Sequence, residues 1–227
     1  HVWDELYGGH CDRWIVGNPT DKPPLEILRY LMQTGKDAYE KYFYGLISDK
    51  IRLTGDITPS YAALNKLQLE LVKSRLESVG FTVKVIFLMR DPVSRNWSAL
   101  RFYNRQRINR GNISASQLVE QFEKFYSSKD VIDRMSYDKI IPAIYDTFEK
   151  DDIFISFYET LFTKGTMNQL SHFLGIEIVE FDINEKINAT KPMDLPKRNY
   201  DRCREYFSRV YTFCEREFPK TKILWKP

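Results

Sequence analysis

Residues 87–98 (FLMRDPVSRNWS) carry the side chains whose types and spacing are best suited to chemistry: Arg90 at the end of an apolar run, and Ser98 eight residues later. A guanidinium and a hydroxyl both donate hydrogen bonds to an anion, and the start of a helix adds positive potential. Three further arginines share one side of the predicted helix with Ser98: Arg95, Arg101 and Arg105. The pattern predicts a phosphate site, although such arginines are more often a solvated helix face.

The apolar pattern predicts the elements that position this motif. Residues 83–89 are almost all apolar and rich in β-branched and aromatic side chains, as in a strand that is covered on both faces of a parallel sheet. Asp91 can cap the next helix, and Pro92 suits its first turn. Val93, Trp97 and Leu100 then recur on one helix face and are expected to pack on the sheet.

Strands and helices alternate along the rest of the chain. Helices are expected near residues 25–32, 37–47, 61–79, 93–106, 115–127, 138–149, 166–174 and 199–218, and further strands at 51–53 and 153–157. This order predicts one domain over residues 1–227, of the α/β class, with three layers in which helices flank a parallel sheet. Ligands of such folds bind outside the carboxyl ends of the strands, where Arg90, Asp56 and Tyr158 would lie.

Four segments, taken in chain order, resemble the family of sulfotransferases that use 3'-phosphoadenosine 5'-phosphosulfate (PAPS). Arg90 and Ser98 have the family's spacing, and residues 54–61 (TGDITPSY) are similar to its Glu-Lys-Ser/Thr-Pro-x-Tyr turn. Residues 153–161 (IFISFYETL) and 172–176 (HFLGI) resemble its Tyr-Glu-x-Leu strand end and the Phe-Leu-Gly that follows. The resemblance implies a P-loop nucleotide-hydrolase-like fold of the carbohydrate or bacterial type, PAPS as co-substrate and adenosine 3',5'-bisphosphate as product.

The resemblance also implies which residues bind the cofactor. Arg90 and Ser98 match the positions that hold the 3'-phosphate of PAPS. Lys197 and Arg198 stand where relatives fold a basic loop over the same phosphate, just after Pro196. A plain basic cluster near a helix start is the alternative, and it is unfavourable to the helix dipole unless an anion lies nearby. Both interpretations stay open, whereas Tyr158 and Glu159 are expected to serve as scaffold.

The resemblance identifies the catalytic residues less completely than the cofactor-binding ones. Asp56 stands where the family often has glutamate, and Ile57 replaces the lysine that contacts the sulfonate. Residues 1–4 (HVWD) align with the second half of a family segment that follows the phosphate loop, so His1 is a second candidate near the reacting group. The first strand, the Gly-rich 5'-phosphosulfate loop and the family's glutamate base are therefore expected upstream of His1.

These observations predict a transferase of class EC 2.8.2. It would move a sulfuryl group from PAPS to a hydroxyl of a carbohydrate or small metabolite by in-line displacement, with no metal ion. Two alternatives stay open. One is a P-loop nucleotide kinase, which would need a Gly-Lys-Ser/Thr loop, and the other is a non-catalytic module that kept the nucleotide pocket.

Composition limits the partners and the compartment. The chain has 227 residues, 43% hydrophobic and 15% aromatic, which supplies one sizeable core. A net charge of +3 is too small to indicate nucleic acid, and the locally basic residues 101–110 suit either an anionic acceptor or a solvated loop. No apolar run is long enough to span a bilayer. Three cysteines favour a reducing, cytoplasmic location, whereas Asn-x-Ser/Thr sequences leave the Golgi lumen open.

Overall fold

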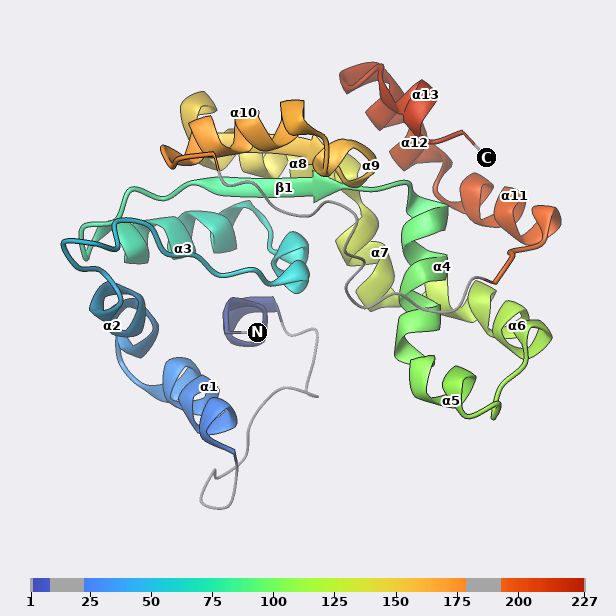
Figure 1. Cartoon of the computed structure of the whole chain (residues 1–227), viewed down its shortest axis with the longest axis horizontal. Coiled ribbons are helices and arrows are strands. Elements are labelled where there is room, and N and C mark those ends of the chain that lie inside the picture. Colours follow the sequence, from blue (N-terminus) through green and yellow to red (C-terminus); the bar gives the residue numbers. More distant parts are fainter. Residues whose placement is uncertain (1, 9–22, 179–192, 227) are drawn as a thin grey trace. The chain divides into compact units, whose positions relative to one another are not determined.

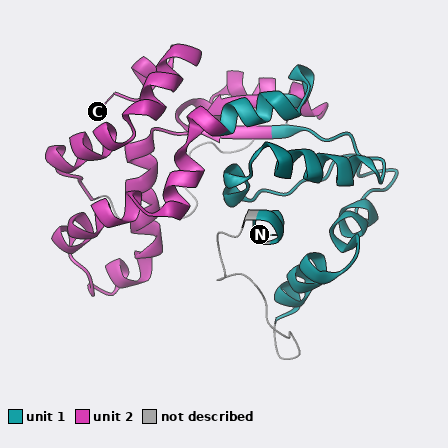
Figure 2. Ribbon diagram, turned by 180° about the vertical axis from the view of Figure 1, so that it is seen from behind, with its two compact units in different colours: residues 1–85, 140–153 teal, residues 86–139, 154–227 magenta. Residues whose placement is uncertain are grey.

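The computed structural model describes residues 2–8, 23–178 and 193–226 (Figure 1). The chain divides into two compact units (Figure 2). Unit 1 comprises His1–Val85 with Ile140–Ile153, and unit 2 comprises Ile86–Lys139 with Phe154–Pro227. A single domain over residues 1–227 stays a prediction.

Unit 1 is built around helices that pack on an aromatic core. Its elements are η1 (Asp4–Gly8), α1 (Pro24–Thr34), α2 (Ala38–Gly45), η2 (Pro59–Ala63), α3 (Lys66–Glu77), η3 (Lys150–Asp152) and most of α8 (Tyr137–Thr147). Trp3 and Tyr39 lie at its centre with their rings 4.5 Å apart, and Val2, Met32 and Leu64 are buried beside them. The N-terminal aromatic residues thus belong to the core of this unit.

Unit 2 holds the sheet and the remaining helices. Its strands are β1 (Val85–Met89) and β2 (Ile153–Phe157), which pair in a small parallel sheet. Its helices are α4 (Pro92–Tyr103), α5 (Arg105–Asn109), α6 (Ala115–Tyr126), α7 (Lys129–Met135), α9 (Tyr158–Leu161), α10 (Lys164–Leu174), α11 (Lys197–Tyr206), α12 (Ser208–Glu217) and α13 (Thr221–Leu224). The order confirms the α/β class expected from the sequence.

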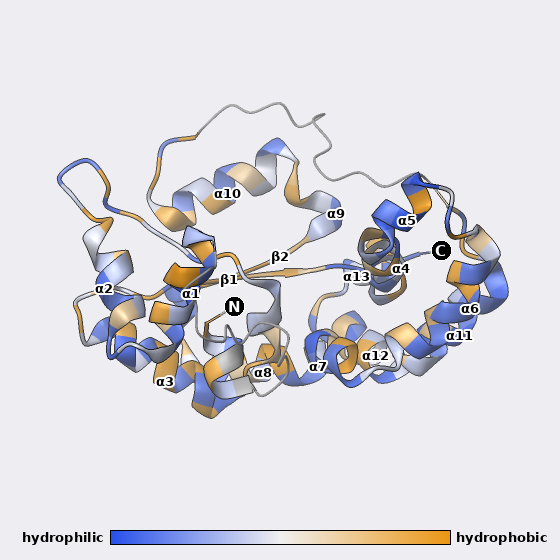
Figure 3. Cartoon of the chain, turned by 90° about the horizontal axis from the view of Figure 1, so that it is seen from below, coloured by the Kyte–Doolittle hydropathy of each residue, from blue (hydrophilic) through white to orange (hydrophobic). Residues whose placement is uncertain are grey.

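Aromatic contacts show that both faces of β2 are covered. Phe154 contacts Phe173 of α10, with ring centroids 5.4 Å apart. Phe157 lies three residues later and so points to the opposite face, where it contacts Phe218 at 6.0 Å and Trp225 at 6.3 Å. In Figure 3, α10 and α12 accordingly lie on opposite sides of the strands.

The apolar period of residues 199–218 predicts one buried stripe: Cys203, Phe207, Val210, Tyr211, Cys214 and Phe218. The structure buries all of them except Phe218, which is half-buried. The expected single helix is wrong in one respect, because α11 and α12 are separated at Phe207, whose backbone (φ −94°, ψ 19°) leaves the helical region. Cys203 and Cys214 are free thiols, as their separation predicts.

Two strand predictions need correction. β1 begins at Val85 rather than at residue 83, and the side chains of Ile86 and Leu88 are 42% and 39% exposed. The expectation that both faces of this strand are covered is therefore wrong for the described residues, because alternate side chains of β1 remain partly exposed there. Residues 51–53 form no strand, because the N–H and carbonyl of Ile51 both pair with Ser48 in a local turn.

Helix boundaries also differ from the expected ones. α3 begins at Lys66 rather than at residue 61, because Asn65 caps it and exchanges hydrogen bonds with Gln68. The helix expected over residues 93–106 ends at Tyr103, where α5 takes over after Asn104. The pattern did not predict α7. Among the described helices, none has the length and apolar character required to cross a membrane.

Candidate functional site

The turn after β1 is held by the side chains of two residues of unit 2, Tyr137 at the start of α8 and Glu159 of α9. The Tyr137 hydroxyl accepts a hydrogen bond from the Arg90 N–H at 3.4 Å and donates one to the Arg90 carbonyl at 3.1 Å. The next N–H, of Asp91, donates to Glu159 Oε1 at 2.9 Å. These bonds satisfy the main chain of the turn, and the bond to Asp91 agrees with the scaffold role expected of Glu159.

α4 begins as the sequence predicts. Asp91 Oδ2 accepts a hydrogen bond from the Ser94 N–H at 2.8 Å, and Pro92 occupies the first turn. Val93, Trp97 and Leu100 are buried. The face that carries these residues therefore packs inward and leaves Ser98 on a half-buried side of the helix.

The Arg90 side chain lies against Tyr158. Its guanidinium carbon is 4.3 Å from the centroid of the Tyr158 ring, and the ring is 46% exposed. Within the described ranges, the Arg90 guanidinium and the Ser98 hydroxyl form no hydrogen bond, so both have donors available to an anion. As scaffold, the Tyr158 hydroxyl was expected to bond within the turn that ends its own strand; the contact found is instead that of its ring with Arg90.

The neighbouring arginines divide into two groups. Arg95 does not flank Ser98 as expected, because its guanidinium turns to α7 and donates to the Arg134 carbonyl at 3.3 Å. Arg101 lies closer to the candidate site. Its pKa lies below the ordinary value, first because of burial and then because of the nearby positive charge of Arg90. Two positive charges close enough to perturb each other would be stabilised by an anion between them.

The segment that leads into α11 is attached to the same helix. Trp97, next to Ser98, donates a hydrogen bond from Nε1 to the Met193 carbonyl at 2.8 Å, and α11 packs on α4. Lys197 and Arg198, the first residues of α11, are both exposed. Lys197 Nζ lies 2.9 Å from Asp201 Oδ2, which accounts for part of its charge without a ligand.

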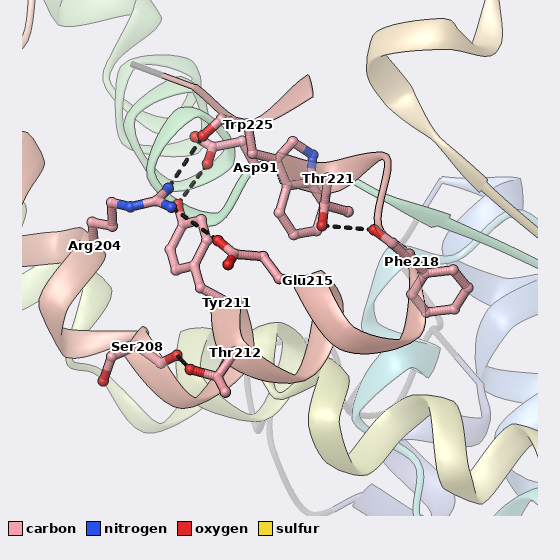
Figure 4. Close-up of polar contacts among 9 residues, drawn as sticks. All are labelled: Asp91, Arg204, Ser208, Tyr211, Thr212, Glu215, Phe218, Thr221 and Trp225. Carbon is pink, nitrogen blue, oxygen red and sulfur yellow. Dashed lines mark hydrogen bonds and ion pairs between the residues drawn. The ribbon is translucent and has the colours of Figure 1, made fainter. Parts of the chain in front are cut away.

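A network of buried and half-buried residues joins the turn after β1 to the C-terminal helices (Figure 4). The Tyr211 hydroxyl donates to Asp91 Oδ1 at 2.5 Å, so each carboxylate oxygen of Asp91 has a partner. The guanidinium of Arg204 stacks 3.9 Å from the Tyr211 ring centroid and donates to the Trp225 carbonyl at 3.1 Å and to Glu215 Oε1 at 3.3 Å. Burial and the Asp91 charge raise the pKa of Tyr211.

Sequence reasoning identified Tyr211 only as part of the buried stripe. The phenol of Tyr211 was the signal that could have indicated a distant hydrogen bond, because a buried tyrosine hydroxyl normally requires a partner. The partner lies 120 residues earlier in the chain. Periodicity could therefore place the ring but could not identify the bond.

Asp56 belongs to unit 1 and has three hydroxyl partners. Tyr39 and Tyr61 donate to its Oδ2 at 3.0 and 2.7 Å, and Thr58 donates to Oδ1 at 2.6 Å. Burial, followed by the Asp56 charge, raises the pKa of Tyr61. Burial is also the largest cause of the raised pKa of Tyr39. The adjacent Ile57 is 97% exposed, whereas His1 lies outside the described residues.

The model of the sulfotransferase domain family matches residues 22–216, which is most of the chain. The chain therefore belongs to the sulfotransferase family, and the α/β fold with a small parallel sheet agrees with that membership. The resemblance found in the sequence is confirmed. Neither the curated proteins nor the solved structures contained a match.

Proposed function

We propose that the protein is a PAPS-dependent sulfotransferase that moves a sulfuryl group to a hydroxyl of a carbohydrate or small metabolite by in-line displacement. One observation carries the proposal: Arg90 and Ser98, on one strand, turn and helix of a sulfotransferase-family chain, both have donors available to an anion. Bound PAPS would supply the activated sulfuryl group. Family membership favours this function over the nucleotide kinase.

The residues proposed to hold the 3'-phosphate fit an anion. The Arg90 guanidinium is oriented by the Tyr158 ring, which leaves its N–H groups for charge-assisted hydrogen bonds. Ser98 can add a hydroxyl donor from the second turn of α4, on a half-buried side of the helix. Lys197 and Arg198 would be held near the 3'-phosphate by the Trp97–Met193 hydrogen bond, which attaches the segment before α11 to α4.

Asp56 and His1 are the proposed acid–base residues. Asp56 is the one that the structure describes, and its two carboxylate oxygens already accept three hydrogen bonds, from Tyr39, Thr58 and Tyr61. We infer that its main effect is to orient Tyr39 and Tyr61. Asp56→Asn should then lower kcat by less than the roughly 10²- to 10⁴-fold expected for loss of a general base.

Binding of the product tests the cofactor site directly. Adenosine 3',5'-bisphosphate should raise the melting temperature, whereas adenosine 5'-monophosphate, which lacks the 3'-phosphate, should raise it much less. Arg90→Ala should abolish the rise. Arg216→Ala is the matched control, because that exposed arginine lies over the Phe213 ring, much as Arg90 lies over Tyr158, and its ion pair in the described part of the chain is with its neighbour Glu217.

An unchanged response in Arg90→Ala would remove Arg90 from the site. Transfer of labelled sulfate from PAPS to a panel of hydroxyl acceptors separates the enzyme from the non-catalytic module, which would bind the nucleotide without turnover. The cytoplasmic location stays a prediction that fractionation of the host cell can test.

A further inference from the structure

The first residues that the structure describes are fixed in the core of unit 1. Val2, Trp3 and Asp4 are 4%, 1% and 3% exposed. The N–H of Val2 belongs to the peptide bond with His1, which is one of the two proposed acid–base residues. A side chain that holds this N–H therefore holds the main chain directly beside His1.

Two neighbouring side chains of η2 hold this segment. The Tyr61 hydroxyl accepts a hydrogen bond from the Val2 N–H at 3.3 Å, and the Ser60 hydroxyl donates one to Asp4 Oδ2 at 2.6 Å. The partners are 59 and 56 positions apart in the sequence, and η1 accordingly packs on η2. The segment that follows His1 is thus bound to the turn at residues 54–61.

The direction of the bond to Val2 is set by Asp56. A tyrosine hydroxyl carries one proton, and an ionised carboxylate can only accept. Tyr61 therefore donates its proton to Asp56 Oδ2, at 2.7 Å. The pKa of Tyr61 is raised, first by burial and then by the Asp56 charge, so the phenol keeps this proton. Its lone pairs remain for the Val2 N–H, which can only donate.

Asp56 orients a second aromatic side chain toward the same segment. Tyr39 donates to Asp56 Oδ2 at 3.0 Å, and its ring lies edge-on to the Trp3 ring with the centroids 4.5 Å apart. Tyr61 thus reaches the segment through its hydroxyl, whereas Tyr39 reaches it through its ring. This difference allows the two contacts to be removed separately.

The position of these bonds relates them to the proposed reaction. Asp56 is exposed and Val2 is buried, so the bonds lead from the surface of unit 1 to the main chain beside His1. A general base must lie within hydrogen-bond reach of the proton that it takes. A misplacement of about 1 Å can cost about a hundredfold in rate. A hydroxyl that fixes the main chain at Val2 supplies a restraint of this kind.

We propose that Tyr61 is a positioning residue of the transfer reaction: its hydroxyl, oriented by Asp56, fixes the main chain at Val2 and with it the proposed acid–base residue His1. The proposal rests on the proposed function, because it takes His1 as part of the reacting site. It gives Asp56 an indirect role, through Tyr61, in place of a direct proton transfer.

Two single substitutions separate the positioning bond from its neighbour. Tyr61→Phe and Tyr39→Phe each keep the ring and remove one donor to Asp56 Oδ2, but only Tyr61→Phe removes the acceptor of the Val2 N–H. Tyr61→Phe should lower kcat by about ten- to a hundredfold and leave the KM for PAPS within about twofold. Tyr39→Phe, the matched control, should keep kcat within about threefold of the wild type.

Two further measurements distinguish positioning from a general loss of stability. Amide exchange of Val2, followed by NMR with isotope-labelled valine, should be at least about tenfold faster in Tyr61→Phe and should change less than about twofold in Tyr39→Phe. In a His1→Ala background, Tyr61→Phe should lower kcat by less than about twofold, because its effect passes through His1.

A pair of substitutions at Asp56 tests the same role without changing Tyr61. Asp56→Asn keeps an oxygen that can accept the Tyr61 proton, whereas Asp56→Ala leaves the hydroxyl without this partner. Asp56→Ala should therefore lower kcat at least about threefold more than Asp56→Asn. This comparison decides on the proposal even if Tyr61→Phe does not fold. The thermal response to adenosine 3',5'-bisphosphate shows which variants fold and bind cofactor.

Several results would overturn the assignment and leave the proposed function intact. A kcat of Tyr61→Phe within about threefold of the wild type would show that the hydroxyl does not position the reaction. An equal fall in Tyr39→Phe would show that only the stability of the network matters. A full loss on adding Tyr61→Phe to His1→Ala would show that the effect does not pass through His1. Absence of transfer from PAPS by the unmodified protein would instead overturn the proposed function, and this proposal with it.

Discussion

Removal of one hydroxyl, in Tyr211→Phe, tests whether the C-terminal helices position the candidate phosphate site. The phenol donates to Asp91 Oδ1 at 2.5 Å, and both residues are buried. Without the hydroxyl, a buried carboxylate oxygen loses its partner, which costs about 2–3 kcal/mol. For a chain of this size, that corresponds to a melting temperature lower by roughly 4–12 °C.

The same substitution should weaken nucleotide binding. Asp91 follows Arg90 directly and caps the helix that carries Ser98, so a shift of its carboxylate reaches both proposed ligands. We expect the dissociation constant of adenosine 3',5'-bisphosphate to rise about tenfold, or about 1.4 kcal/mol. Calorimetric titration measures it. Tyr206→Phe is the matched control, because the exposed Tyr206 side chain lies on the preceding helix.

The pH dependence of stability supplies an independent readout. The pKa of Tyr211 is raised by burial and by Asp91, so the native protein keeps the phenol proton at pH values where the unfolded chain releases it. The contribution of Tyr211 to stability is therefore complete below about pH 10 and decreases above it, by about 1.4 kcal/mol per pH unit. Tyr211→Phe should remove this part of the alkaline slope, and Tyr206→Phe should not.

Two outcomes would refute the reasoning. If Tyr211→Phe unfolds within about 0.5 kcal/mol of the wild type, the bond to Asp91 does not contribute as described. If stability falls but the nucleotide affinity stays within twofold of the wild type, the network supports the fold alone and does not position the site.

The remaining predictions concern other contacts. Tyr158→Leu should weaken binding of adenosine 3',5'-bisphosphate several-fold, and Tyr158→Phe should preserve it, because the ring makes the contact with the guanidinium. Glu40→Ala should destabilise the protein by about 1–3 kcal/mol in urea unfolding, since it removes the buried carboxylate that pairs with Arg75 and leaves that partly exposed guanidinium with its bond to Tyr7, while the exposed Glu70→Ala should cost less than about 0.5 kcal/mol. The Cys214 thiol should react with a disulfide reagent only under unfolding conditions, because burial raises its pKa to about 12.

Local sequence patterns accounted for the part of the site that lies in one stretch of chain. The cap at Asp91, the proline at the first turn of α4 and the burial of Trp97 follow from interactions over four or fewer residues or from a single periodic face. The strand at residues 153–157 and the buried stripe of α11 and α12 were predicted for the same reason. Family membership agrees with the order of the motifs.

Predictions failed where a segment depended on partners outside its own pattern. Residues 51–53 are apolar in alternation, but a turn with Ser48 satisfies their backbone instead of a neighbouring strand. Arg95 has the helical spacing to flank Ser98, but α7, which the pattern did not predict, provides a carbonyl that redirects its guanidinium. Propensity and period describe a segment by itself, and they do not specify what packs against it.

The sequence by itself determined the class of fold, the strand, turn and helix that carry Arg90 and Ser98, and the concentration of positive charge after them. Only the tertiary structure decided that Tyr137, Glu159 and Tyr211 converge on that turn, since each bond spans between 47 and 120 residues. Hydrogen-bond partners at such separations are set by how helices pack, and one chain pattern is compatible with many packings. The residue types and spacing of the candidate site were therefore readable in the sequence, whereas the bonds that hold its turn became visible only in the folded protein.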